Sequence, residues 1–433
     1  MIELIEQTST QTVDGKMRVT VTFDIPVREN AGGALDLERG LQRALNGVGQ
    51  IVMAEALGRF DTEGEPILLG SVFLTSKGRA PERYRTLFGP VDVARHVYQT
   101  NDGGRTFCPL EQSARICENA TIGLCQMLAA KHVSLSGRGL LRELELSHQL
   151  DFTLSYLQDV TQEFGRRALA KEEHWTYAPA TAPGEAAALV IYLDGTCGAI
   201  CQEGYKQVMV GAIDVLDEAG ERLETAYLAH APEDGKATFL ARMERELERL
   251  RPRYGDLMWM GLCDGAPDLQ TWLEAHCDYC TLDFYHVTEY VSECAPAFAQ
   301  TEVKKKAWMQ DTLHDLKHQN GGAKKLLNQL TAKLEELKAQ APESEHQSAL
   351  VDAVRYIGNN LDRMDYAGNR TLSVPIGSGV IEAACKHVVK QRVGCSGMKW
   401  KRKGLQAVLT LRSLYQSTGR WEQFWNKVQA LGW

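Results

Sequence analysis

Apolar and polar residues alternate along two N-terminal stretches, and this pattern predicts β-structure there. Residues 17–27 read MRVTVTFDIPV, which is typical of a half-buried strand. Residues 83–100 alternate around Gly89-Pro90, which predicts a hairpin. Helical spacing over residues 35–57 predicts a helix between them. Residues 1–115 are therefore predicted to form a small α+β domain, and they contain no recognisable set of catalytic residues.

The pattern becomes helical over residues 116–176, with breaks at 134–139 and near 147. Short helices with tight breaks are compatible with a helix-turn-helix DNA-binding motif and equally with a plain helical bundle, so both interpretations stay open. The Pro-, Ala- and Gly-rich stretch 177–187 predicts a linker to the next domain.

Beyond this linker, residues 188–300 predict a mixed sheet covered by helices. ALVIYLDGTCG is a buried apolar strand that ends in Asp194, and two further strands continue it as a β-meander. After a charged helix, an apolar strand ends at Asp264 and turns into a helix. The last strand and its helix place His286 at the strand's end. This order predicts a sheet with helices on its faces.

The C-terminal part contains an insertion and a return to the sheet domain. Residues 301–369 are almost wholly helical and include an antiparallel helix pair. Residues 370–415 complete the sheet domain, and residues 416–433 form a basic, aromatic tail whose Trp421, Phe424 and Trp425 are expected to pack. The chain as a whole is predicted to be a multidomain α+β protein.

Composition agrees with a globular protein of several domains, because the 433 residues are 44% hydrophobic and 24% charged. No apolar run approaches the ~20 residues that span a bilayer, and the N-terminus has no signal-peptide pattern, so we expect a cytoplasmic protein without a membrane partner. The eleven cysteines are scattered and odd in number, which favours reduced thiols over disulfides. The single CxxC, Cys277 and Cys280, has no second ligand pair at zinc spacing.

The net charge of −8 hides an asymmetry. From residue 384 to the end, ten Lys or Arg oppose one Glu, so this segment carries +9 and the preceding residues carry −17. Attraction to phosphate decays over about 8–10 Å, so a local basic tail favours a polyanionic partner more than the total charge opposes it.

Three carboxylates stand out by their position. Asp194 and Asp264 lie at the ends of strands expected to be neighbours, and Glu382 lies on the helix predicted after the PIGSG turn. On that helix Glu382, Lys386 and Lys390 recur every four residues and share a face. Each residue also has an ordinary interpretation, since Asp-Gly is a common turn signal and Glu–Lys pairs are common on exposed helices.

Clustered carboxylates repel one another, so at least one pKa rises unless a cation neutralises them. Hard oxygen ligands favour Mg²⁺ or Mn²⁺, which keep waters and accept phosphate oxygens as further ligands. Two such ions can activate a water and stabilise the leaving 3′-oxygen of a phosphodiester. The three acids together therefore predict phosphoryl transfer with two metal ions.

These residues resemble a family. YLDGT at Asp194, LCDGAPDL at Asp264, LDFYHVTEY, and the C-terminal GSGVIEAACKHVVKQRVGCSGMKWKRKGLQAVLTLRSL are similar to DDE-type transposases of bacterial insertion sequences, in particular the Kra group. The resemblance covers residue 188 to the C-terminus and extends more weakly over the N-terminal part. It implies a ribonuclease H-like catalytic domain, with Asp194, Asp264 and Glu382 as the metal-binding triad.

The resemblance implies cleavage of double-stranded DNA at element ends, followed by attack of the freed 3′-hydroxyl on target DNA. It also implies a nucleoid-associated bacterial protein that acts as a homodimer or higher oligomer on DNA. His286 is expected to orient a phosphate or a water, and a structural histidine is an equal alternative. The expected DNA contacts are Lys386, Lys390, Arg392, Lys399, Trp400, Lys401, Arg402, Lys403 and Trp308.

Hydrophobic packing is the alternative for both tryptophans, Trp308 and Trp400. For the whole protein, one rival is a structure-specific nuclease or junction resolvase of the same fold, which cuts DNA without joining it. Another is a domesticated DNA-binding protein that has lost catalysis. A metabolic enzyme is disfavoured because the sequence has no Gly-rich nucleotide loop and no Ser/Cys–His motif.

Overall fold

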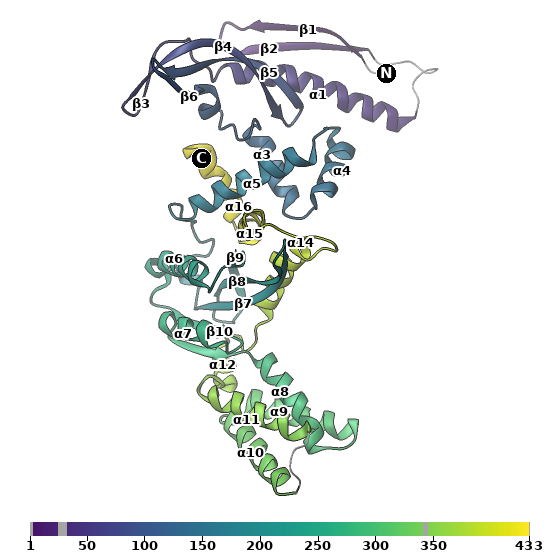
Figure 1. Cartoon of the computed structure of the whole chain (residues 1–433), viewed down its shortest axis with the longest axis vertical. Helices are drawn as coiled ribbons and strands as arrows, with labels where there is room; N and C mark the ends of the chain where they lie inside the picture. The colour runs from purple at the N-terminus through teal and green to yellow at the C-terminus, as the bar shows by residue number, and fades with distance from the viewer. Residues whose placement is uncertain (1–2, 25–32, 341–344, 433) are drawn as a thin grey trace. The chain divides into compact units, whose positions relative to one another are not determined.

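The computed structural model describes residues 3–24, 33–340 and 345–432 (Figure 1). These residues form two compact units, Met1–Lys171 with Glu422–Trp433, and Glu172–Trp421. Along the sequence, the first unit ends at Lys171 and the second begins at Glu172, before the predicted linker 177–187. Tyr254 donates a hydrogen bond to the Thr181 carbonyl (2.9 Å), and Thr181 N donates to Glu224 (3.1 Å). The predicted linker is therefore packed on the second unit.

The first unit begins with the predicted β-structure. β1 (Glu3–Gln11) and β2 (Met17–Asp24) form an antiparallel hairpin, and α1 (Ala34–Gly58) confirms the helix predicted over 35–57. Residues 25–27 of the predicted strand lie outside the described residues. A four-stranded sheet follows in chain order, made of β3 (Ile67–Leu69), β4 (Val72–Thr86), β5 (Gly89–Thr100) and β6 (Gly103–Phe107).

The β4–β5 pair is the hairpin predicted around Gly89-Pro90, and Gly89 has a φ of +118°, a conformation that favours glycine. Helices follow the sheet: α2 (Pro109–Ser113), α3 (Ile122–His132), α4 (Gly137–His148) and α5 (Leu154–Lys171). α16 (Arg420–Leu431) packs on α5, where Trp425 stacks on Phe164 with ring centroids 4.7 Å apart. The predicted packing of Phe424 and Trp425 is confirmed, and the helix-turn-helix interpretation stays a prediction.

The second unit contains the predicted mixed sheet. Its strands are β7 (Ala188–Ile200), β8 (Gly204–Leu216), β9 (Arg222–His230), β10 (Met258–Cys263) and β11 (Tyr279–Leu282), in the spatial order β11-β10-β7-β8-β9. β7, β8 and β9 form an antiparallel meander, and β10 and β11 run parallel to β7. Parallel strands need crossovers, which α6 (Ala237–Tyr254) and α7 (Pro267–His276) supply.

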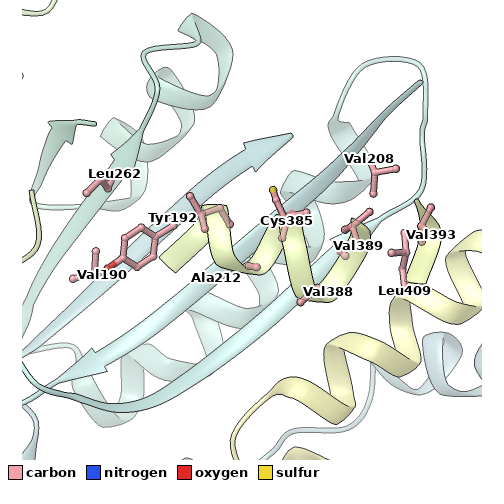
Figure 2. Close-up of a cluster of buried hydrophobic side chains, with 14 of the residues drawn as sticks. Val190, Tyr192, Val208, Ala212, Leu262, Cys385, Val388, Val389, Val393 and Leu409 are labelled. Carbon is pink, nitrogen blue, oxygen red and sulfur yellow. The ribbon is translucent and has the colours of Figure 1, made fainter. Parts of the chain in front are cut away.

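Side chains of β7 alternate between two buried cores, one on each face of the sheet. Leu189, Ile191 and Leu193 pack with apolar residues of α6 and α7. Val190 and Tyr192 face the other way, toward the helical segment that carries Cys385, Val388 and Val389 (Figure 2). Because both faces are covered, β7 reads as a continuous apolar run rather than an alternating one.

Asp214 of β8 is a buried charge on the same face as Tyr192. It is 1% exposed and accepts a hydrogen bond from the Thr225 hydroxyl (2.5 Å). Burial raises the pKa of Asp214 to about 6, because its charged form loses hydration. The Asp214 charge in turn adds to the effect of burial in raising the pKa of Tyr192.

This raised pKa predicts a pH-dependent stability. The contribution of Asp214 is fully present below about pH 4 and is lost as pH rises through about 6, because the unfolded chain ionises more easily than the folded one. We expect wild type to lose about 2–3 kcal/mol from this group between pH 4.5 and 8. Asp214→Asn keeps the acceptor for Thr225 and should remove this loss. Urea unfolding of both proteins at both pH values measures it, and an equal change in the variant would contradict it.

α8 (Phe284–Phe298) follows β11 and precedes the helical insertion predicted over residues 301–369. The predicted insertion corresponds to α9 (Glu302–His318), α10 (Gly322–Gln340), α11 (Glu345–Asn359) and α12 (Tyr366–Thr371), which share an apolar core with α8. The predicted helix pair corresponds to α10 and α11, where Gln347 donates to the Leu337 carbonyl (3.0 Å). Among the described residues, no helix combines the length and apolar character needed to cross a membrane. All eleven cysteines are free.

Candidate functional site

The register between β7 and β10 brings two of the three predicted acids to the same level of the sheet. The strands are parallel, and their last pairs join Gly261 to Ile191 and Leu262 to Tyr192. Asp194 and Asp264 each follow the Tyr192–Leu262 pair by two residues. Asp264 comes directly after β10, as predicted. β7 does not end at Asp194 as predicted, because its pairing with β8 continues to Ile200.

Asp194 is a half-buried residue of β7. Its Oδ1 accepts a hydrogen bond from Gly195 N (2.6 Å), and its Oδ2 accepts one from the Cys385 thiol (3.5 Å). Burial raises the pKa of Asp194, and the nearby charge of Asp264 raises it further, whereas these hydrogen bonds and His286 oppose the rise. The two aspartates therefore form a repelling pair that a cation would stabilise.

Cys385 is a member of this site that sequence reasoning missed. It is 5% exposed, and burial together with the Asp194 charge raises the pKa of its thiol. The neutral thiol thus serves as a donor to Asp194. The sequence did contain a signal for this residue. Cys385 follows Glu382 by three residues, which would place it on the buried face of the same helix.

Asp264 is held by the loop that follows β10 and by the insertion. Its Oδ1 accepts from Ala266 N (3.0 Å), and its backbone carbonyl accepts from the Tyr356 hydroxyl of α11 (2.8 Å). Gly265 has a φ of +86°, and a Cβ there would lie 3.0 Å from Leu282 Cδ1. The Asp-Gly pair is therefore a turn signal and also positions the carboxylate.

Glu382 lies on α13 (Gly379–Ala384) with its side chain exposed. The Ser378 hydroxyl lies 3.1 Å from Glu382 Oε1 and 2.7 Å from Asp283 Oδ2. One hydroxyl proton serves only one acceptor at a time, so Ser378 is shared between the two carboxylates. This sharing links Glu382 to the start of α8.

Asp283 was also missed, although an Asp before an apolar helical run is an N-cap signal. It is fully buried, caps α8 by accepting from Tyr285 N (3.1 Å), and accepts from Ser378 N (2.9 Å). His286 Nε2 lies 3.8 Å from Asp283 Oδ2. The prediction that His286 ends a strand is wrong, because β11 stops at Leu282 and His286 belongs to the first turn of α8.

The helix after Glu382 is not a regular α-helix as predicted. A π-helical segment, Cys385–Lys390, follows α13 and leads into α14 (Gln391–Val393). Cys385, Val388 and Val389 are buried against the sheet, whereas Glu382, Lys386 and Lys390 stay exposed. Such segments are rare in proteins and are frequently found at functional sites.

The predicted DNA contacts divide into exposed and engaged side chains. Exposed side chains belong to Lys386, Lys390, Lys399, Lys401 and Lys403. Arg392, in contrast, is 3% exposed and lies 4.9 Å from the ring centroid of Trp400. Arg402 is ion-paired with Glu203 and donates to the Pro232 carbonyl (3.0 Å). The burial of Arg392 argues against its predicted contact with DNA, whereas the Arg402 side chain is 39% exposed and its predicted contact stays a prediction.

Both tryptophans proposed for stacking are engaged in packing. The Trp400 indole donates to the Val393 carbonyl (3.1 Å), and its backbone bridges the end of β7 at Ile200. Trp308 stacks on Phe298 with centroids 4.2 Å apart, and both rings pack against the apolar core that α8 shares with the insertion. Both tryptophan rings are partly buried, and their role in stacking on a base stays a prediction.

The donor chemistry of the three acids suits a hard divalent cation. Among the residues that the structure describes, however, no group of three or more His, Cys, Asp or Glu side chains is arranged to hold a metal ion. Asp194 and Asp264 interact with each other, while Glu382 contacts Ser378. The fold therefore brings the three acids to the same face of the sheet. In this structure, however, their carboxylates do not point at one common position.

A scan against models of protein families and a search of curated proteins found no match to this chain. The functional conclusion therefore depends on the geometry of Asp194, Asp264 and Glu382.

Proposed function

We propose that this protein is a DDE-type transposase that cleaves DNA at element ends and joins the 3′-end to target DNA. The observation that carries the proposal is the alignment of Asp194 on β7 with Asp264 directly after the parallel strand β10, next to a helix that carries Glu382. A meander followed by two parallel strands on the other side of β7 supports a ribonuclease H-like catalytic domain.

The chain's own residues have defined roles in this proposal. Asp194 and Asp264 would hold the metal, and Glu382 would join them after rotating away from Ser378. When bound, a pair of Mg²⁺ or Mn²⁺ ions lowers the pKa of a water and neutralises charge on the phosphate. Lys386 and Lys390 contact phosphates beside the acids, and His286 orients a phosphate or a water next to Asp194.

Both chemical steps exchange one P–O bond for another. In the first, a water oxygen attacks phosphorus, the bond to the 3′-oxygen breaks, and that oxygen leaves as a hydroxyl after taking up a proton. In the second, this 3′-hydroxyl attacks a target phosphodiester and displaces the target's own 3′-oxygen. No covalent link to the protein is needed, so catalysis depends on positioning and on charge stabilisation.

The test uses a labelled duplex that contains the DNA flanking the gene, with target plasmid and Mg²⁺ or Mn²⁺. Joined products that disappear with EDTA support the transposase. Cutting without joining would support the resolvase-like nuclease, and metal-independent binding without products would support a non-catalytic DNA-binding protein. Pairing of two DNA ends should also yield complexes with at least two protomers, which light scattering measures.

The exposed lysines beside Glu382 give a further prediction. Lys386→Gln with Lys390→Gln should weaken duplex binding and lower the slope of log affinity against log salt by about 2, because each phosphate contact contributes about 1. Fluorescence anisotropy at several salt concentrations measures the slope. Lys333→Gln is a control, since Lys333 is ion-paired with Glu336 (2.8 Å). An unchanged slope in the double variant would exclude these phosphate contacts.

A further inference from the structure

A pocket of about 410 Å³ lies on the second unit beside the helix that carries Glu382. Phe284 and Tyr285 line it from the start of α8, Lys317 from α9, and Arg222 from the start of β9. The remaining lining residues come from the segment that leads into α13 and from α13 itself, namely Ile376, Gly377, Gly379, Val380 and Ala383. The pocket therefore combines two cations, two aromatic rings and small apolar residues.

Two cations line the pocket. Among the described residues, neither Arg222 nor Lys317 has a carboxylate within ion-pair distance, although the charge of Arg222 acts on the buried Asp214 and opposes the rise that burial causes in its pKa. The Lys317 ammonium lies 5.1 Å from the centroid of the Phe284 ring. Lys305 and Lys325, on the same helix and the next, are instead paired with Glu302 (2.8 Å) and Asp315 (2.6 Å). Lys317 of α9 and Arg222 of β9 therefore give the pocket a positive charge that would attract a phosphate.

Tyr285 provides a large exposed ring at the pocket, 56% exposed in this structure. Its backbone N–H is fixed by Asp283, which caps the helix (3.1 Å). The ring lies against Gly377, where a Cβ would approach Tyr285 Cε2 to 2.6 Å. A tyrosine held at a helix start, with a glycine beneath one edge, is a stacking surface of low entropic cost.

We propose that this pocket binds one unstacked nucleotide of the DNA strand, with the base on Tyr285 and the phosphates on Lys317 and Arg222. This inference rests on the proposed function, because it assigns a substrate contact to the same site. Its volume lies within the range of small-ligand pockets. The pocket takes the role that the sequence suggested for Trp308, whose ring is stacked on Phe298.

Hydrogen bonds link Tyr285 of this pocket to the candidate acid Glu382. Asp283 binds both Tyr285 N and Ser378 N, and Ser378 lies 3.1 Å from Glu382 Oε1. A nucleotide held on Tyr285 is therefore separated from Glu382 by one short hydrogen-bonded chain. Its neighbouring phosphodiester would extend toward the acids along α13.

The experiment uses the full chain and a fluorescein-labelled 12-nucleotide single-stranded thymidine oligonucleotide with 5-iodouracil near its centre. Irradiation followed by mass spectrometry should find the cross-link on Tyr285. By anisotropy, Tyr285→Ala should weaken binding about tenfold, whereas Tyr285→Phe should retain it, because stacking needs only the ring. Arg222→Gln with Lys317→Gln should weaken binding and lower its salt dependence.

Matched controls separate the pocket from general surface effects. Tyr205 is 79% exposed on β8 and lies outside the pocket, so Tyr205→Ala should bind as wild type does. Lys324→Gln, an exposed lysine of α10, tests loss of charge alone. The proposal is overturned by cross-links only at other residues, by unchanged affinity in Tyr285→Ala and the double variant, or by no binding in wild type.

The outcome is distinguishable from that of the proposed function. Cross-linking at Tyr285 without metal-dependent cleavage would retain the nucleotide pocket and reject the transposase. Metal-dependent cleavage and joining with normal activity in Tyr285→Ala would retain the transposase and reject the pocket.

Discussion

Asp264→Asn is expected to lower the rate of DNA strand cleavage by at least about 10³-fold, the scale of removing one strong electrostatic contribution to a transition state. The substitution keeps an acceptor for Ala266 N and leaves the turn at Gly265 intact. It removes one of the two charges that lie level on β7 and β10. Single-turnover cleavage of a labelled duplex in Mg²⁺ and Mn²⁺ measures the rate.

The matched control for this prediction is Asp268→Asn. Asp268 lies four residues away at the start of α7 and forms an exposed ion pair with Lys236, so its loss should leave cleavage near the wild-type rate. Duplex affinity should be retained in Asp264→Asn, because the exposed lysines are unchanged. Cleavage by Asp264→Asn within tenfold of wild type would exclude Asp264 from the reaction.

Asp283→Ala should lower the free energy of unfolding by about 2–4 kcal/mol, which would make it one of the most destabilising single changes in the second unit. Asp283 is fully buried and accepts from Tyr285 N, Ser378 N and the Ser378 hydroxyl. Alanine removes the cap of α8 and leaves buried donors without an acceptor. Urea unfolding followed by circular dichroism measures the change.

Two further variants test whether the effect comes from these hydrogen bonds. Asp283→Asn keeps one acceptor oxygen and should lose less stability than alanine. Asp365 caps α12 through one hydrogen bond to Gly368 N (3.0 Å) and is exposed, so Asp365→Ala should cost about 1 kcal/mol or less. If Asp283→Ala unfolds within 0.5 kcal/mol of wild type, the buried cap does not stabilise the unit.

The elements of the second unit were predictable because their patterns are local. The continuous apolar run of β7, the meander after it, and the strand that stops before Asp264 all appear in the spacing of apolar residues. Boundaries were less accurate where pairing extends a strand beyond its apolar core. β7 therefore continues past Asp194. β11 instead ends early, at Leu282, because Asp283 caps α8, so His286 lies on this helix.

The net charge of the segment from residue 384 to the C-terminus does not show which of its cations are free to bind a polyanion. The excess of ten cations over one Glu is real, yet Arg392 and Arg412 are buried and Arg420 is ion-paired with Glu246 (2.7 Å). Burial lowers the pKa of Arg412 to about 10. Five lysines of this segment remain exposed, namely Lys386, Lys390, Lys399, Lys401 and Lys403. The sequence records the charges but not which cations the fold buries or pairs.

By itself, the sequence determined the mixed sheet, the helical insertion, and the positions of Asp194, Asp264 and Glu382 along the chain, since periodicity and turn residues act over a few neighbouring positions. Only the tertiary structure decided that Asp283 and Cys385 join these acids, that Arg392 is buried, and that Tyr285, Lys317 and Arg222 line one pocket. Arg222 and Lys317 are 95 residues apart, and such distant segments meet only when sheet and insertion pack together.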